Sequence, residues 1–240
     1  MTEQVLAPHG FRRLLCQNCG SFIDVPIHCS SKSCEICTGI RRWRIYRRIF
    51  YALEHLGNTP RNRWRHITLT VRNSWDLAER LDHLVKSFRN LRQRKIWKST
   101  QDLGFYVIEI TKGESGWHPH LHIISYGRYL PFRKLLSGWL SVTKDSHSIG
   151  IRTIKSGRNI ARYVSKYITK PSSLLSSEIY HIDEVTKHRR LFGPFGAAHQ
   201  LMITWKIPDK KRVCVSCGGT DFLPDFVVEI YSRAAIRDTS

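Results

Sequence analysis

Acidic residues and long apolar segments are what this sequence most clearly lacks. Asp and Glu together number 19, against 39 Lys and Arg, so the net charge is +20 and the pI is about 10.1. No segment approaches the roughly 18 consecutive apolar residues of a membrane-spanning helix. The N-terminal segment MTEQVLAPHGFRRLL also lacks the basic-then-apolar order of a signal peptide. We therefore expect a cytoplasmic protein that does not act at a membrane.

The excess of basic residues predicts a polyanionic partner. For a soluble chain, nucleic acid is the leading candidate, and a surface charge that only keeps the protein soluble is the alternative. The composition is otherwise that of a globular protein, with 41% hydrophobic and 24% charged residues. A length of 240 residues is sufficient for one sizeable core with a small appendage.

The seven cysteines are clustered, which indicates metal binding. Three Cys-x-x-Cys pairs occur, as CQNC, CEIC and CVSC, and glycine follows the first and the last of them. In a reducing compartment such pairs predict zinc before disulfides, because one tight turn presents two thiolates to a tetrahedral ion. Three pairs exceed what a redox dithiol requires. The cysteines are Cys16, Cys19, Cys29, Cys34, Cys37, Cys214 and Cys217.

Two arrangements of zinc ligands are open. In the first, CQNC and CVSC share one ion across the two ends of the chain. A second ion is then left for Cys29, Cys34, Cys37 and a histidine, with His28 as the candidate. In the second, CQNC pairs with CEIC and the C-terminal pair has no partner. We favour the first because it leaves no Cys-x-x-Cys pair unused.

A basic amphipathic helix is predicted over residues 38–57. Apolar residues recur at intervals of three and four, from Ile40 through Trp43 and Tyr46 to Leu56, and Gly57 ends the run. The other face is rich in arginine, which at this density beside a zinc module favours contact with phosphate over a merely solvated face. The candidate DNA-binding residues are Arg41, Arg42, Arg44, Arg47, Arg48, Arg63, Arg65 and Lys170.

Alternating patterns predict strands on both sides of a second helix. RHITLTVR (65–72) is typical of a half-buried strand, and Asn73 or Ser74 is expected to cap the helix that follows. GFYVIEIT (104–111) alternates again. The turn KGESGW then predicts an antiparallel hairpin with GWHPHLHIISYG (116–127).

The hairpin predicts a metal site with open positions. His120 and His122 are two apart in a strand and therefore share a face, and the turn length places Glu109 opposite one of them. A lone strand histidine is more often structural, but three convergent ligands favour a metal. Mixed nitrogen and oxygen ligands with vacant positions suit Mn²⁺ or Mg²⁺ better than zinc. His118 precedes Pro119 and is expected in the loop.

A candidate nucleophile follows on the C-terminal side. A helix is predicted from Pro131, with Leu135, Leu136, Trp139 and Leu140 buried, then a short strand in HSIGIRTIKS (147–156). GRNIARYVSKYITKP (157–171) predicts a helix that Pro171 ends. Its tyrosines lie four apart on one face beside lysines, so they face a cleft or pack the helix. The residues are Tyr163, Lys166, Tyr167 and Lys170.

The motifs HITLT, HPHLH and YVSKYITK, in this order over residues 64–171, resemble the HUH endonucleases, in the branch of rolling-circle replication initiators. The cysteine-rich segment before them resembles that of some plasmid and small-virus members. The second tyrosine resembles the two-tyrosine initiators of isometric single-stranded DNA phages. The resemblance implies an antiparallel sheet of the RNA-recognition type, with the histidine strand central and the tyrosine helix across the metal.

The resemblance also implies a mechanism. Tyr163 would attack a phosphate of single-stranded DNA that is polarised by the metal of His120, His122 and Glu109, giving a 5′-phosphotyrosine and a free 3′-OH. Tyr167 could make a second attack, and Lys166 would assist the phenol. The implied partners are single-stranded DNA at a replication origin, with a hairpin or flanking duplex, and the helicase and polymerase of a prokaryotic host. The chain is too short for a helicase domain of its own.

We therefore predict an α+β fold in three segments. Residues 1–40 form an N-terminal zinc-binding module, residues 41–205 the HUH endonuclease domain, and residues 206–240 a C-terminal zinc knuckle that packs with the first. Two other functions remain open: a two-tyrosine HUH transposase that acts on element ends, and a non-enzymatic zinc-containing DNA-binding protein. A zinc hydrolase is disfavoured because the tyrosine helix would then have no role.

Overall fold

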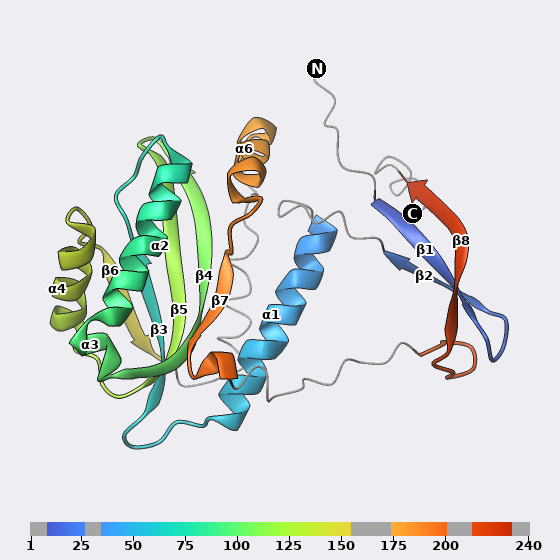
Figure 1. Cartoon of the computed structure of the whole chain (residues 1–240), viewed down its shortest axis with the longest axis horizontal. Coiled ribbons are helices and arrows are strands. Elements are labelled where there is room, and N and C mark those ends of the chain that lie inside the picture. Colours follow the sequence, from blue (N-terminus) through green and yellow to red (C-terminus); the bar gives the residue numbers. More distant parts are fainter. Residues whose placement is uncertain (1–8, 27–34, 155–173, 201–212, 232–240) are drawn as a thin grey trace. The chain divides into compact units, whose positions relative to one another are not determined.

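The computed structural model describes residues 9–26, 35–154, 174–200 and 213–231 (Figure 1). The chain forms two compact units. The smaller one comprises residues 1–37 and 208–240, and the larger one comprises residues 38–207. The predicted α+β class with an antiparallel sheet is confirmed. Among the described helices, none is both long and apolar enough to cross a membrane.

The larger unit is built on a five-stranded antiparallel sheet with the order β6-β3-β5-β4-β7. Its strands are β3 (Arg63–Thr70), β4 (Gln101–Gly113), β5 (Gly116–Gly127), β6 (Ile149–Thr153) and β7 (Phe192–Gly196). The histidine strand β5 is therefore central, with β4 on one side and β3 on the other. The β4–β5 hairpin register pairs Glu109 with His120 and Val107 with His122, and β3 pairs Thr68 with His122.

Helices cover both faces of this sheet (Figure 1). Against one face lie α2 (Leu77–Gln93), α3 (Lys95–Lys98) and α4 (Phe132–Thr143), and α6 (Ser176–Thr186) adds partly buried residues to the same core. That core contains Ile67, Leu69, Leu121 and Ile123 of the strands. Because side chains alternate along a strand, His120 and His122 lie on the opposite face.

Helix α1 (Glu35–His55) packs on the histidine face. The buried residues of its second half are Ile45, Ile49, Ala52 and Leu53. Together with sheet residues such as Phe105 and Ile124, they form a second core. The predicted apolar stripe is wrong at Trp43, which is 49% exposed, and the guanidinium carbon of Arg47 lies 4.7 Å from the centre of its ring. The helix thus presents Ile45 to the core, and the sequence-based stripe omitted it.

Further local predictions differ from the structure. His118, expected in the loop, lies in β5 and pairs with Thr111. Helix α2 is capped by Asp76, whose side chain accepts a 2.9 Å hydrogen bond from the Glu79 N–H, and not by Asn73 or Ser74. The Ser74 backbone instead pairs with Trp117 of β5 in an isolated bridge. Strand β3 is buried on both faces, not half-buried, because it lies between β5 and β6 in a sheet covered on both sides.

Helix α4 begins after Pro131, close to the predicted start, and buries Leu135, Trp139 and Thr143. Leu136 and Leu140 are only half-buried. The indole Nε1 of Trp139 donates a 2.7 Å hydrogen bond to the Thr70 carbonyl oxygen. This bond joins α4 to the end of β3.

The smaller unit is a three-stranded antiparallel sheet of β2 (Phe22–Pro26), β1 (His9–Cys16) and β8 (Phe222–Tyr231), in that order. It joins segments from the two ends of the chain, since His9 pairs with Tyr231 and Cys16 with Phe222. Among its described side chains, Leu14 is the one buried aliphatic residue.

Candidate metal centres and active-site face

Four cysteines of the smaller unit converge on one point. The sulfurs of Cys16 and Cys217 are 3.6 Å apart, as are those of Cys19 and Cys214. All four sulfurs lie within 4.8 Å of one another, and together they could hold a metal ion such as zinc. These are the cysteines of the arrangement that we favoured from the sequence, in which CQNC and CVSC share one ion.

The two Cys-x-x-Cys turns have the same backbone geometry. The Gly20 N–H donates to the Cys16 carbonyl at 2.9 Å, and the Gly218 N–H donates to the Cys214 carbonyl at 2.8 Å. Gly20 and Gly218 have φ angles of 71° and 73°, a left-handed conformation that glycine adopts without a steric penalty. The glycines after the first and last Cys-x-x-Cys pairs therefore end two turns of the same geometry. Each turn directs its two sulfurs toward the four-cysteine cluster.

The thiols of the cluster influence one another's ionisation. Hydrogen bonds from Ser21 lower the pKa of Cys19 to about 6. The Gly219 N–H lowers the pKa of Cys217, but the neighbouring thiols, Cys19 first, outweigh it and raise that pKa to about 12. Four adjacent thiols therefore cannot all ionise near neutral pH unless a cation offsets the negative charge.

The second group of predicted zinc ligands cannot be assessed in the same way. Cys29, Cys34 and His28 lie outside the described residues. Cys37 is buried in the first turn of α1.

The predicted histidine–carboxylate group lies on one face of β4 and β5. The Nε2 atom of His122 is 3.0 Å from Oε2 of Glu109, and both side chains are buried. His120 is paired with Glu109 in the register, but its Nε2 lies 3.2 Å from the hydroxyl of Thr111. Among the described residues, the ligand atoms of these three side chains do not form a group with metal-site spacing.

The hydrogen bonds of Thr111 define the tautomer of His120. The Thr111 hydroxyl donates its proton to the His118 carbonyl at 2.9 Å, so it must accept from His120 Nε2–H. Nδ1 is then the ring nitrogen of His120 that retains a lone pair. The donor set of two imidazoles and one carboxylate suits a divalent cation, and a change of the His120 rotamer would be needed to complete it.

His66 belongs to this group, and the sequence-based assignment missed it. Its Nε2 lies 3.3 Å from Nδ1 of His122, and the two rings are stacked with centroids 5.5 Å apart. His66 thus contacts Nδ1 of His122, while Nε2 of His122 faces Glu109. An outer partner of this kind commonly holds a ligating histidine in position through its second ring nitrogen.

Burial keeps two imidazoles of this face neutral. Desolvation, followed by the proximity of His122 and Arg152, lowers the pKa of His66 to about 4. Desolvation, followed by the proximity of His118, lowers the pKa of His120 to about 4 even though Glu109 opposes the shift. At neutral pH both rings are uncharged, which is the form that binds metals.

The predicted nucleophile segment is not described. Tyr163, Lys166, Tyr167 and Lys170 lie outside the described residues.

The predicted DNA-binding arginines fall into different environments. Arg44, Arg48 and Arg63 are exposed, and Arg41, Arg42 and Arg47 are half-buried. Arg65 differs from these because it is buried. Its Nη1 donates to the carbonyl oxygens of Gly127, at 2.8 Å, and Arg63. This environment argues against a phosphate contact for Arg65 and favours a structural role at the end of β3.

Comparisons with known proteins point to one family. The model of a replication protein family matches residues 21–213, which is more than half of the chain. A curated relative named Protein rep, from Bacillus amyloliquefaciens, is 24% identical over 214 residues, which cover 72% of this chain and 63% of the relative. Another Protein rep, from a Bacillus species, is 29% identical over 145 residues, with coverage of 55% and 45%. The chain thus spans less than two thirds of either relative. No solved structure matches.

Proposed function

This chain belongs to the replication protein family, and from that premise we propose that it initiates rolling-circle replication. In this proposal it nicks single-stranded DNA at an origin, stays joined to the 5′ end and later rejoins the strand. The net charge of +20 supports a nucleic-acid partner. The observation that carries the proposal is the contact of His122 with Glu109 on the face that His120 shares.

We assign His120, His122 and Glu109 as ligands of a divalent cation, Mn²⁺ or Mg²⁺. When bound, such an ion would polarise a phosphate and offset the charge that develops during cleavage. His66 holds the His122 ring from Nδ1, which leaves Nε2, 3.0 Å from Oε2 of Glu109, to share the ion with that carboxylate. The neutral state of His66 and His120 supports this assignment because a protonated imidazole cannot bind a metal.

The covalent step is assigned to Tyr163. Its phenolate oxygen attacks the phosphorus, the bond from phosphorus to the 3′ oxygen breaks, and that oxygen leaves as a 3′-OH after taking up a proton. A free tyrosine has a pKa of about 10, so Lys166, three residues on, would favour loss of the phenol proton. Tyr167 would attack in the same way in a second transfer.

We assign zinc to the four-cysteine cluster. Zn–S bonds of about 2.3 Å in a tetrahedron require sulfurs roughly 3.8 Å apart, and the two closest pairs here are 3.6 Å apart. A second zinc held by Cys29, Cys34, Cys37 and His28 remains a proposal from the sequence. So do phosphate contacts by Lys170 and the arginines of α1, a host helicase and polymerase as partners, and a location in the cytoplasm of a prokaryotic cell.

A denaturing gel tests the enzymatic proposal. The protein is incubated with single-stranded DNA from its own replicon, with Mn²⁺ and then with EDTA. We expect a metal-dependent, protease-sensitive adduct that mass spectrometry maps to Tyr163. Tyr163→Phe should abolish it, whereas Tyr180→Phe, at a tyrosine of α6 that is 69% exposed, should not.

Two results would change the assignment. Full cleavage by Tyr163→Phe would move the nucleophile to Tyr167. The absence of any adduct, despite tight and salt-sensitive binding, would make the protein a DNA-binding protein without this activity. A His122→Ala variant separates the steps further, since it should lose cleavage and retain binding.

A further inference from the structure

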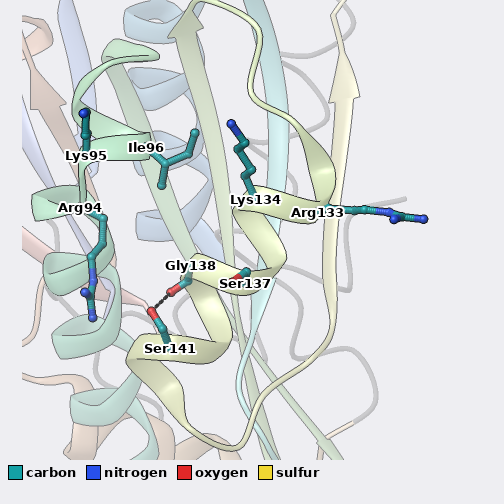
Figure 2. Close-up of a pocket in the computed structure, with 8 residues that line it drawn as sticks. All are labelled: Arg94, Lys95, Ile96, Arg133, Lys134, Ser137, Gly138 and Ser141. Atoms are coloured by element: carbon teal, nitrogen blue, oxygen red, sulfur yellow. Dashed lines mark hydrogen bonds between the residues drawn. The ribbon is translucent and has the colours of Figure 1, made fainter.

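A basic groove lies between α3 and α4, in the larger unit and on the side of the sheet away from the histidines. Figure 2 shows its lining, which comes from the start of α3 and from one flank of α4. Its volume is about 430 Å³. The lining residues are Arg94, Lys95, Ile96, Arg133, Lys134, Ser137, Gly138 and Ser141.

Helix α4 carries two separate stripes. Leu135, Trp139 and Thr143 are buried in the core. Lys134, Ser137, Gly138 and Ser141 follow the spacing i, i+3, i+4, i+7 and form the wall of the groove. Apart from Lys134 these residues are small, and none of the four belongs to the apolar core.

The small residues let α4 lie close to its neighbours. A Cβ atom added to Gly138 would be 3.2 Å from Leu91 Cδ1 and 3.7 Å from Ile96 Cγ2, so the floor of the groove is tightly packed. The Ser141 hydroxyl donates to the Gly138 carbonyl at 2.8 Å. The part of the lining that comes from Ser137, Gly138 and Ser141 is therefore formed by small residues.

The groove has positive charge without acidic partners. Its lining includes four cations and no carboxylate. Within the described part of the chain, none of the four forms an ion pair, whereas Arg80, Lys112 and Arg189 each pair with a carboxylate. Figure 2 shows Lys95 and Lys134 extending on either side of Ile96, and Arg133 extending away from the other lining residues.

The position of two of these cations costs stability. Arg133 and Lys134 lie in the first turn of α4, which contains no acidic residue. Cations at this end of a helix are repelled by the helix dipole. Arg133 and Lys134 therefore lie where their charges disfavour the helix. A bound anion would explain why cations occupy these two positions.

We propose that this groove binds the phosphate backbone of double-stranded DNA. The proposal rests on the proposed function, because it assumes a DNA-binding replication protein. Sites for single strands usually combine positive charge with aromatic side chains on which bases stack, and the lining contains no aromatic residue. The groove thus suits the backbone of a duplex, held on the other side of the sheet from the candidate cleavage residues.

A charge-matched pair of variants tests the groove. The groove variant combines Arg94→Gln, Lys95→Gln, Arg133→Gln and Lys134→Gln. The control combines Lys86→Gln, Arg89→Gln, Lys187→Gln and Arg190→Gln, at four exposed positions outside the groove. Both lose four charges, so a general effect of net charge is the same in each.

The measurement is fluorescence anisotropy of a labelled 20-base-pair duplex over a range of salt concentrations. Each lost phosphate contact lowers the slope of log K against log salt by about 0.9. Loss of two to four contacts should therefore reduce the slope by about 1.8–3.6. At 0.1 M salt, loss of two contacts corresponds to binding that is about 60-fold weaker. The control should weaken binding only a few-fold, since its four positions do not line the groove.

Three outcomes would overturn the proposal. Equal weakening of duplex binding by both variants would show that only the net charge matters. Unchanged duplex binding by the groove variant would show that the groove does not contact the duplex. An equal loss of affinity for a single-stranded oligonucleotide would reassign the groove to single strands. Thermal unfolding controls for misfolding, because neutralising the first turn of α4 should leave the Tm unchanged or raise it.

A cleavage assay keeps this proposal separate from the previous one. The groove variant should still cleave a short single-stranded oligonucleotide that contains the nick site, with Mn²⁺ present. If the unmodified protein does not cleave it, the proposed function fails whatever the duplex titration gives. If cleavage is normal and duplex affinity is unchanged in the groove variant, only the groove proposal fails.

Discussion

Removal of the metal from the four-cysteine cluster is expected to unfold the smaller unit and leave the larger unit folded. Burial of Leu14, the one buried aliphatic side chain among the described residues of this unit, provides only about 1.5–3 kcal/mol. Ordering the backbone costs about 1–2 kcal/mol per residue. A structural zinc ion contributes roughly 10–16 kcal/mol. The contribution of a bound metal would therefore exceed that of the one buried aliphatic side chain among the described residues of this unit.

Two signals separate the units in one sample. All seven tryptophans lie between Trp43 and Trp205, within the larger unit, so their fluorescence reports on that unit alone. Hydrogen exchange followed by mass spectrometry reports on β1 and β8. After metal removal by a strong chelator, we expect exchange in these strands to become fast while the tryptophan emission is unchanged.

A variant pair sharpens this test. Cys16→Ser removes one sulfur and should reproduce the effect of the chelator. Val215→Ser changes a side chain in the other Cys-x-x-Cys turn that is 95% exposed and should have no effect. Retained protection of β1 and β8 in the metal-free protein, or in Cys16→Ser, would refute the argument that the metal stabilises this unit.

Three other perturbations have defined outcomes. Asp145→Asn should destabilise the protein by about 1 kcal/mol at pH 7. Burial raises the pKa of Asp145, but hydrogen bonds from Ser146 and Arg80 outweigh it and lower the pKa below its usual value. The stability that comes from this lowered pKa is fully present above the unfolded pKa of about 3.9 and is lost as the pH falls through the folded pKa. The free energies of unfolding of the two proteins, measured by urea titration, should therefore converge near pH 2. A difference that stays constant with pH would contradict this. Gly104→Ala should cost several kcal/mol in the same titration, because its Cβ would lie within 3 Å of the Phe195 ring and would also overlap the Ile124 carbonyl; a wild-type midpoint would contradict the tight approach. His66→Ala should weaken Mn²⁺ binding by about 10–100-fold in calorimetry, and an unchanged affinity would show that His66 does not position the ligand beside it.

The parts of the fold that depend on local chain geometry could be predicted from the sequence. The β4–β5 hairpin is one example, because its turn length places Glu109 opposite His120 or His122, and the structure pairs it with His120. The cap of α2 could not be predicted in this way. Asn73, Ser74 and Asp76 are all competent caps, and the choice depends on the bridge from Ser74 to Trp117, which lies far along the chain.

The same distinction applies to the candidate site. His66 was missed because its contact with His122 depends on the pairing of β3 with β5, which is non-local. Alternation did place His66 on the face opposite Ile67 and Leu69, so a partial signal was present. Arg65 was assigned to DNA because the sequence does not reveal that both faces of β3 are covered. The groove between α3 and α4 likewise depends on how two helices pack.

The spacing of the cysteines along the chain has a consequence for biosynthesis. Cys214 follows Cys19 by 195 positions, so the ribosome exposes the first two sulfurs long before the last two are made. At about 5–20 residues per second, this interval is roughly 10–40 s. During that time the larger unit can fold while Cys16 and Cys19 have only half of their ligand set. A product cut short before Cys214 could not complete the four-sulfur site, so this site forms only in chains that have been translated past Cys217.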